Sequence, residues 1–94
     1  MSASSERLAV ASVVLPADLH ARPAGQVSQL VAGFDAEVEL VAGARTARAV
    51  SVLAVMGLGA QAGEQIEVRA SGPEATQAAH AVAAVLGAAE AVAG

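Results

Sequence analysis

Hydrophobic and polar residues follow one another along the chain in patterns that predict strands and helices in a fixed order. The uncharged run Leu8–Leu15 is rich in valine and leucine, which is typical of a buried strand. After it, apolar side chains recur at helical spacing, and they predict a helix from about Ala21 to Ala32. The apolar residues at this spacing are Val27, Leu30, Val31 and, just after the predicted helix, Phe34.

The middle of the chain predicts a hairpin followed by a short helix. Residues Glu37–Val41 alternate between charged and apolar side chains, as in a half-exposed strand, and Arg45–Ala49 returns after a turn at Gly43. Ser51 is a good residue to cap the N-terminus of a short helix over Val52–Met56, which two glycines follow.

The last third of the chain predicts one more strand and one more helix. Residues Ile66–Ala70 alternate again, and the Ser-Gly-Pro-Glu sequence that follows places Pro and Glu where helix N-termini favour them. His80 would lie on the solvent side of that helix, opposite its apolar stripe. The stripe consists of Ala75, Ala78, Val82, Val85 and Ala89.

The predicted order is therefore β-α-β-β-α-β-α. Helices with one apolar stripe and later strands with one polar face fit an α+β domain in two layers. We predict an open-faced sandwich, with a four-stranded antiparallel sheet and three helices on one face. A chain of 94 residues suits a single domain over 1–94, in which residues 1–6 are expected to be loosely ordered.

Composition and charge exclude several functions. The chain has no cysteine, so thiolate catalysis and cysteine-based metal sites are excluded, and we expect neither a metal nor a cofactor. It has one phenylalanine and no Trp or Tyr, which leaves little for bases to stack on. The five basic residues are scattered arginines in a chain of net charge −4, and we expect no nucleic-acid partner.

No uncharged run is long enough for a membrane span. Residues 49–63 and 75–89 fall short of the ~18–20 apolar residues that a span needs. The apolar run that begins after Arg7 is barely as long as the hydrophobic core of a signal peptide, and the acidic Glu6 lies close to it. We therefore interpret this run as a first strand. We expect a cytoplasmic monomer with no membrane contact.

The segment Leu19–Pro23 carries the most specific chemistry. A histidine just before a helix faces free backbone N–H groups at a partially positive end, which attracts phosphate. That end disfavours a protonated imidazole, and a neutral ring keeps a lone pair that can attack a phosphoryl group. Arg22 follows His20 by two residues and can reach phosphoryl oxygens with its guanidinium. Judged by its spacing alone, a histidine just before a helix is more often a helix cap or an ordinary surface residue than a nucleophile.

The short helix carries more apolar residues than one face can bury. Some must be exposed, and an exposed apolar patch on a small protein indicates a partner site. The apolar residues are Val52, Leu53, Val55, Met56 and Leu58.

The sequence Leu19–Ala24 (LHARPA) resembles the active-site motif of the HPr family, the histidine phosphocarriers of the bacterial phosphoenolpyruvate-dependent phosphotransferase system. The resemblance continues through Gly33-Phe34, the block Ser51–Gly59 and Gly63, and so extends over nearly the whole chain. The family also has the β-α-β-β-α-β-α order predicted above. It implies a phosphoryl carrier and not a stand-alone enzyme.

The resemblance implies a role for each matching residue. His20 would be phosphorylated on Nδ1, with Arg22 beside it, by enzyme I, and would pass the group to sugar-specific IIA domains. Ser51 matches a serine that some members use for regulation, which adds a serine-directed kinase as a partner. The residues that would dock on partners are Val52, Leu53 and Met56.

This chain departs from the family pattern at several positions. The family often has lysines around the docking surface, where this chain has Gln29, Ala32 and Ala54, so attraction to acidic partners should be weaker. Asp18 adds a negative charge two residues before His20, where some members have a neutral residue.

Two other functions stay open on the sequence. One is a regulatory protein-binding module of the same fold that acts through Ser51 while His20 is idle. The other is a small structural or ligand-binding domain without phosphoryl chemistry. The presence of both His20 and Arg22 favours the carrier over the regulator, and the sequence does not identify the sugar pathway.

Overall fold

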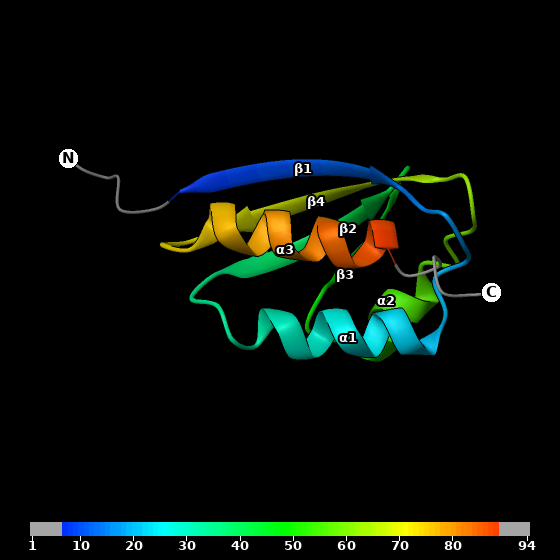
Figure 1. The fold of residues 1–94 in the computed structure, drawn as a ribbon, viewed down its shortest axis with the longest axis horizontal. Helices are drawn as coiled ribbons and strands as arrows, with labels where there is room; N and C mark the ends of the chain where they lie inside the picture. Colours follow the sequence, from blue (N-terminus) through cyan, green and yellow to red (C-terminus); the bar gives the residue numbers. More distant parts are fainter. Residues whose placement is uncertain (1–6, 89–94) are drawn as a thin grey trace.

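The computed structural model describes residues 7–88 as one layered domain (Figure 1). The expectations of loose order over residues 1–6 and of Ala89 on the last helix's stripe lie outside the described residues. The elements are β1 (Leu8–Val14), α1 (Ala21–Val31), β2 (Glu37–Ala42), β3 (Arg45–Arg48), α2 (Val52–Gly57), β4 (Gln65–Ser71) and α3 (Ala75–Ala88). The predicted order is confirmed, and the predicted boundaries differ from these by one or two residues.

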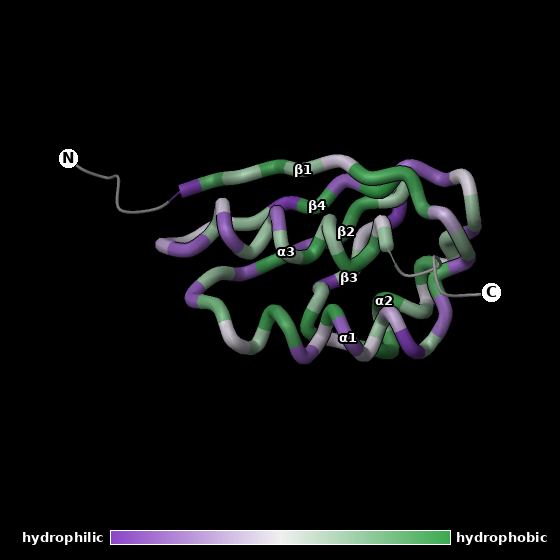
Figure 2. Tube along the Cα trace, viewed as in Figure 1, coloured by the Kyte–Doolittle hydropathy of each residue, from purple (hydrophilic) through white to green (hydrophobic). Residues whose placement is uncertain are grey.

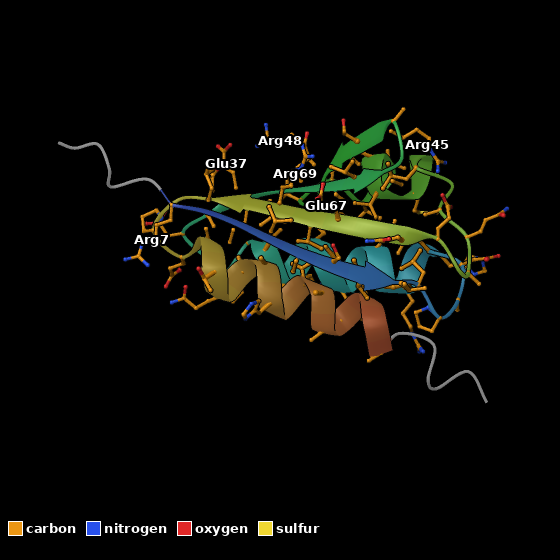
Figure 3. All side chains as sticks on the ribbon, turned by 90° about the horizontal axis from the view of Figure 1, so that it is seen from above. Arg7, Glu37, Arg45, Arg48, Glu67 and Arg69 are labelled. Carbon is orange, nitrogen blue, oxygen red and sulfur yellow. The ribbon has the colours of Figure 1, made fainter. Side chains whose placement is uncertain are left out.

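The four strands form one antiparallel sheet in the order β1-β4-β2-β3. Viewed along the sheet, α1 and α3 lie on one side of it, and Glu37, Arg48, Glu67 and Arg69 lie on the other (Figure 3). The short helix α2 packs against α1 and β3. The predicted open-faced α+β sandwich is confirmed. The polar faces of β2 and β4 are also as predicted, with Glu39 paired in register with Arg48 and Arg69.

The core between the two layers consists of small aliphatic side chains. The sheet contributes alternate residues such as Leu40, Ile66 and Val68, while α1 and α3 contribute residues such as Val27 and Val82. Among the described residues, no polar or charged side chain is fully buried. Such a core packs helices closely onto the sheet and holds the loops at its edges in fixed positions.

The prediction that Leu8–Leu15 is a buried strand is wrong. The sheet order places β1 at an edge, and its residues alternate between the helix side and the open side. Leu8, Val10 and Val14 are exposed on this largely hydrophobic strand (Figure 2). A continuous apolar run does not distinguish a buried strand from an edge strand whose outer face is also apolar.

The Ser-Gly-Pro-Glu segment leads directly into the last helix, as predicted, and the Glu74 carbonyl accepts the first helical hydrogen bond from the Ala78 N–H at 3.0 Å. The Glu74 carboxylate also accepts the Asp35 backbone N–H at 2.7 Å, and so connects the start of α3 to the loop between α1 and β2, which the sequence does not indicate. Gly72 allows this close approach, because it has φ of +117° and a Cβ there would lie 3.1 Å from the Ala36 Cα.

Candidate functional site

His20 is the residue that precedes α1, at the position predicted from the sequence. Its backbone is extended (φ −90°, ψ −174°), and its side chain makes no capping hydrogen bond. The side chain is 77% exposed. The ring is thus at the N-terminus of a helix, free of structural hydrogen bonds to that helix and accessible to another macromolecule.

The first turn of α1 leaves backbone N–H groups available near His20. The first helical bond runs from the Ala24 N–H to the His20 carbonyl, at 3.1 Å. The N–H groups of Ala21 and Arg22 precede it, and Pro23 has none to leave unpaired. No acidic residue lies in this first turn. The positive end of the α1 dipole is therefore open to an anion bound at His20.

The loop before His20 is held against the loop before β4. The buried Leu19 donates its N–H to the Ala60 carbonyl at 3.0 Å, and the Asp18 carboxylate accepts the Ala62 N–H at 2.8 Å. Asp18 also lies beside the imidazole, with its second oxygen 3.8 Å from Nε2 of His20. The sequence shows the negative charge of Asp18 but gives no signal of its bond to Ala62.

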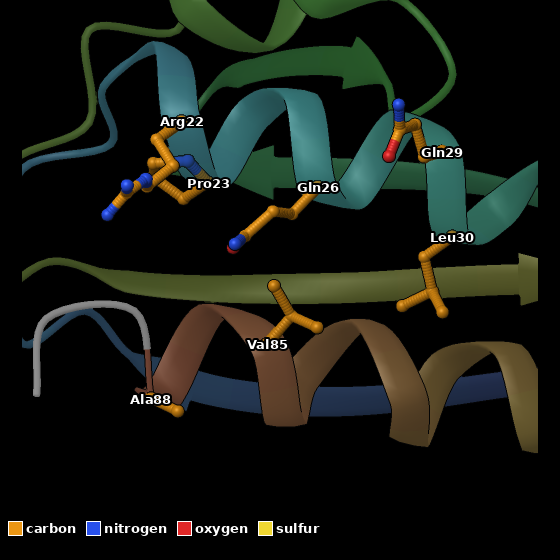
Figure 4. Close-up of a pocket in the computed structure, with 7 residues that line it drawn as sticks. All are labelled: Arg22, Pro23, Gln26, Gln29, Leu30, Val85 and Ala88. Carbon is orange, nitrogen blue, oxygen red and sulfur yellow. The ribbon is translucent and has the colours of Figure 1, made fainter. Parts of the chain in front are cut away.

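His20 and Arg22 line neighbouring depressions and not a single pocket. Around His20 is a shallow depression of about 310 Å³, whose other walls include Met56, Ala60 and Gln61. Arg22 is exposed and lines the end of a groove of about 580 Å³ between α1 and α3, beside Gln26 and Val85 (Figure 4). The structure thus places Met56 at the His20 depression. Arg22 would have to turn from the groove to reach a phosphoryl group on His20.

Helix α2 exposes apolar side chains, as its sequence predicts. Leu53 is 81% exposed and Met56 is 41% exposed, whereas Val52 is half-buried and packs on the core. The exposed apolar surface at α2 therefore consists mainly of Leu53 and Met56, and Val52 contributes less than expected. We call Leu53 and Met56 the α2 patch.

Ser51 caps α2 as predicted. Its hydroxyl accepts the Ala54 N–H at 3.1 Å, and the residue is half-buried. A hydrogen bond that the sequence did not indicate fixes this cap relative to α1, because the Ser28 hydroxyl donates to the Val50 carbonyl at 2.7 Å. This hydrogen bond connects the segment that precedes α2 to α1.

Arg45 is a further residue whose role the sequence does not indicate. It donates to the carbonyls of Ala42 and Leu58 and pairs with Glu64 at 2.8 Å. Glu64 in turn accepts the Gln61 N–H at 2.7 Å. These contacts hold the chain after α2 in place, and with it one wall of the His20 depression.

Two further observations concern the described residues. No helix within residues 7–88 is long and apolar enough to cross a membrane. The same residues contain no group of three or more His, Cys, Asp or Glu side chains placed to hold a metal ion. His80 is exposed on α3, as predicted.

The geometry defines a small α+β domain that exposes a histidine at a helix N-terminus beside an apolar patch. A family model described as "PTS HPr component phosphorylation site" matches residues 9–88. The chain belongs to the HPr family, the phosphocarrier proteins of the phosphotransferase system.

Known proteins are similar in sequence and in structure. The phosphocarrier protein NPr of Escherichia coli K12 is 47% identical over 68 residues, which are 71% of this chain and 76% of that protein. The phosphocarrier protein HPr of Chlamydia muridarum is 37% identical over 62 residues, 66% of this chain and 60% of that protein. The crystal structure of a phosphocarrier protein HPr from Bacillus anthracis matches with a TM-score of 0.75 at 28% identity, over 88% of this chain and 99% of that one.

Proposed function

We propose that this chain accepts a phosphoryl group on His20 from enzyme I and passes it to the IIA domains of a sugar phosphotransferase system. The observation that carries the proposal is the exposed imidazole at the N-terminus of α1, free of any capping hydrogen bond, in a chain of the HPr family. A side chain with only a structural role at this position would be expected to cap the helix through a hydrogen bond or to be buried.

The proposed uptake step is a direct transfer between side chains. The lone pair on Nδ1 of the neutral His20 ring forms a bond to phosphorus while the bond between phosphorus and the phosphorylated side chain of enzyme I breaks. The electrons of the broken bond stay on enzyme I. The reverse step, with a IIA nucleophile in place of enzyme I, releases the group.

Two features of this chain support such a transfer. The free N–H groups at the start of α1 and the positive end of its dipole favour the negative phosphoryl oxygens. The Arg22 side chain is exposed at the end of the α1–α3 groove, two residues from His20, so we infer that it turns toward a phosphoryl group there. Its planar donors bind phosphoryl oxygens in pairs.

The test of the proposal is phosphorylation of the purified chain with phosphoenolpyruvate and an enzyme I. We expect one phosphoryl group per chain that is labile in acid and stable in base, as a phosphoramidate is and a phosphoserine is not. A IIA domain should then remove it. Base-labile phosphate, or no uptake from any enzyme I, would refute the proposal.

The α2 patch is the proposed anchor for enzyme I. Replacing Leu53 with Ala should raise the concentration of this protein needed for half-maximal transfer by roughly five- to 150-fold, the effect of losing an anchor worth ~1–3 kcal/mol. Transfer kinetics with enzyme I measure this. The matched control is Leu8→Ala, because Leu8 is 82% exposed on β1 and Leu53 is 81% exposed on α2.

A salt series separates apolar docking from charge steering. Arg22 is the only charged residue in α1 and α2, so physiological salt should slow transfer only modestly relative to low salt. A steep fall with salt, together with equal kinetics for Leu53→Ala and Leu8→Ala, would contradict the assignment of the α2 patch.

Regulation through Ser51 is a second candidate function, favoured by the position of its hydroxyl beside the α2 patch. Ser51→Asp should weaken transfer from enzyme I roughly tenfold, because a carboxylate at the edge of an apolar interface must lose its hydration. Its melting temperature should stay close to native, since Asp is also a good N-cap.

Ser51→Ala is the control that separates charge from capping. It removes the cap and should lower the melting temperature by roughly 5 °C, from a loss of ~1 kcal/mol. Transfer should stay close to native. If Ser51→Asp melts far below Ser51→Ala, or transfers as fast as the native protein, Ser51 is a structural cap and not a switch.

A further inference from the structure

Asp18 is placed to act on the ring of His20 and not only to hold the loop. Its Oδ1 accepts the Ala62 N–H at 2.8 Å, and its Oδ2 lies 3.8 Å from Nε2 of His20. The backbone on either side is also fixed, since Leu19 bonds to Ala60 and the His20 N–H donates to the Asp18 carbonyl at 3.0 Å. The free carboxylate oxygen is therefore held on the Nε2 side of the imidazole.

No other charged group of the described surroundings competes for this position. Asp18 and His20 are the only titratable residues that line the depression, and α2 beside it carries no charge. Glu64 is engaged by Arg45 and by the Gln61 N–H, and Arg22 lies at the α1–α3 groove. Asp18 is thus the charged side chain that the described residues place beside Nε2.

We propose that Asp18 is a positioning residue that keeps the proton of His20 on Nε2 and so leaves the lone pair on Nδ1 for the phosphoryl group. The proposal rests on the proposed function of His20. A distance of 3.8 Å is longer than a direct hydrogen bond, so the carboxylate acts through its charge or through one bridging water. Either interaction favours the tautomer that carries hydrogen on the nitrogen facing the carboxylate.

The same placement assists the transfer itself. When Nδ1 of the neutral ring bonds to phosphorus, the ring becomes a cation that still carries its proton on Nε2, and Asp18 faces that new charge. On release, the P–N bond breaks, its electron pair returns to Nδ1, and the ring leaves as neutral imidazole with the Nε2 proton in place. No proton has to be exchanged with solvent in either direction.

The test is the tautomer of His20 in the unphosphorylated protein, measured from imidazole ¹⁵N chemical shifts at a pH where the ring is neutral. Asp18→Asn keeps an oxygen for the Ala62 N–H and removes the charge. We expect the ratio of the Nδ1–H to the Nε2–H tautomer to rise roughly two- to fivefold in Asp18→Asn, the range that an exposed charge pair produces. His80 is the internal reference and should not change.

The second readout is the rate of phosphoryl uptake from enzyme I, which should fall by a similar factor in Asp18→Asn. Asp18→Ala removes both the hydrogen bond from the Ala62 N–H and the charge beside Nε2. Hydrogen exchange of the Ala62 amide reports the loss of that hydrogen bond separately from the loss of the charge. Equal tautomer ratios in the native protein and Asp18→Asn would overturn the proposal, even if Asp18→Ala loosens the loop. The tautomer measurement needs no phosphoryl donor, so a native protein that fails to take phosphate would refute the function of His20 and not the role of Asp18.

Discussion

Replacing His20 by alanine should abolish phosphoryl uptake from enzyme I while the domain stays folded. The ring is largely exposed and makes no capping hydrogen bond, so its loss removes the nucleophile without opening the core. Acid-labile phosphate, measured after incubation with phosphoenolpyruvate and enzyme I, should fall to background. Circular dichroism and the melting temperature should stay close to native.

His80→Ala is the matched control for this variant. His80 is the other histidine of the chain and is also exposed, but it lies on α3. His80→Ala should take up phosphate like the native protein. Acid-labile phosphate on His20→Ala, or its loss in His80→Ala, would show that the wrong histidine had been assigned.

Replacing Arg22 by alanine should slow phosphoryl transfer roughly 10- to 150-fold. A charge-assisted hydrogen bond contributes ~1.5–3 kcal/mol, and each ~1.4 kcal/mol changes a rate tenfold. Rapid-quench kinetics with enzyme I measure the effect. Stability should change little, because Arg22 is exposed and does not belong to the core.

Two variants define what Arg22 contributes. Arg22→Lys keeps the charge without the planar pair of donors and should fall between the native protein and Arg22→Ala. Arg69→Ala removes an exposed arginine from the open face of the sheet and should leave transfer unchanged (Figure 3). Native rates in Arg22→Ala would mean that the N–H groups at the start of α1 stabilise the phosphoryl group without help from the guanidinium.

The sequence predicted the elements of this fold well where the signal was local. The cap at Ser51, the exposure of Leu53 and the position of His20 before α1 each depend on a few neighbouring residues, and the structure has all three. Short-range rules for caps and amphipathic faces apply at such positions without knowledge of the rest of the chain.

The sequence did not predict what depends on distant pairing. The apolar run at β1 is compatible with a central strand, and only the pairing of β4 with both β1 and β2 places it at the edge. Glu74 lies at the start of α3, as predicted, but the bond of its carboxylate to the backbone of Asp35, 39 residues away, is not indicated by the sequence. These outcomes depend on which segments the topology brings together.

The same distinction between local and long-range signals applies to the residues of the candidate site. The sequence predicts the positions of His20 and Arg22 at the start of α1 and the exposure of Leu53 and Met56. The hydrogen bond from the Ala62 N–H to the Asp18 carboxylate joins residues 44 positions apart. It fixes one carboxylate oxygen of Asp18, and the other oxygen lies beside Nε2 of His20. No local pattern around Asp18 encodes that bond.

The role of His20 is tested most directly by the nitrogen–phosphorus NMR spectrum of the native protein after incubation with phosphoenolpyruvate and enzyme I. We expect one phosphorus coupled to Nδ1 of His20, with the nitrogens of His80 unchanged. Phosphorus bound to His80, to Ser51 or to no nitrogen at all would contradict the assignment of His20 as the phosphoryl carrier.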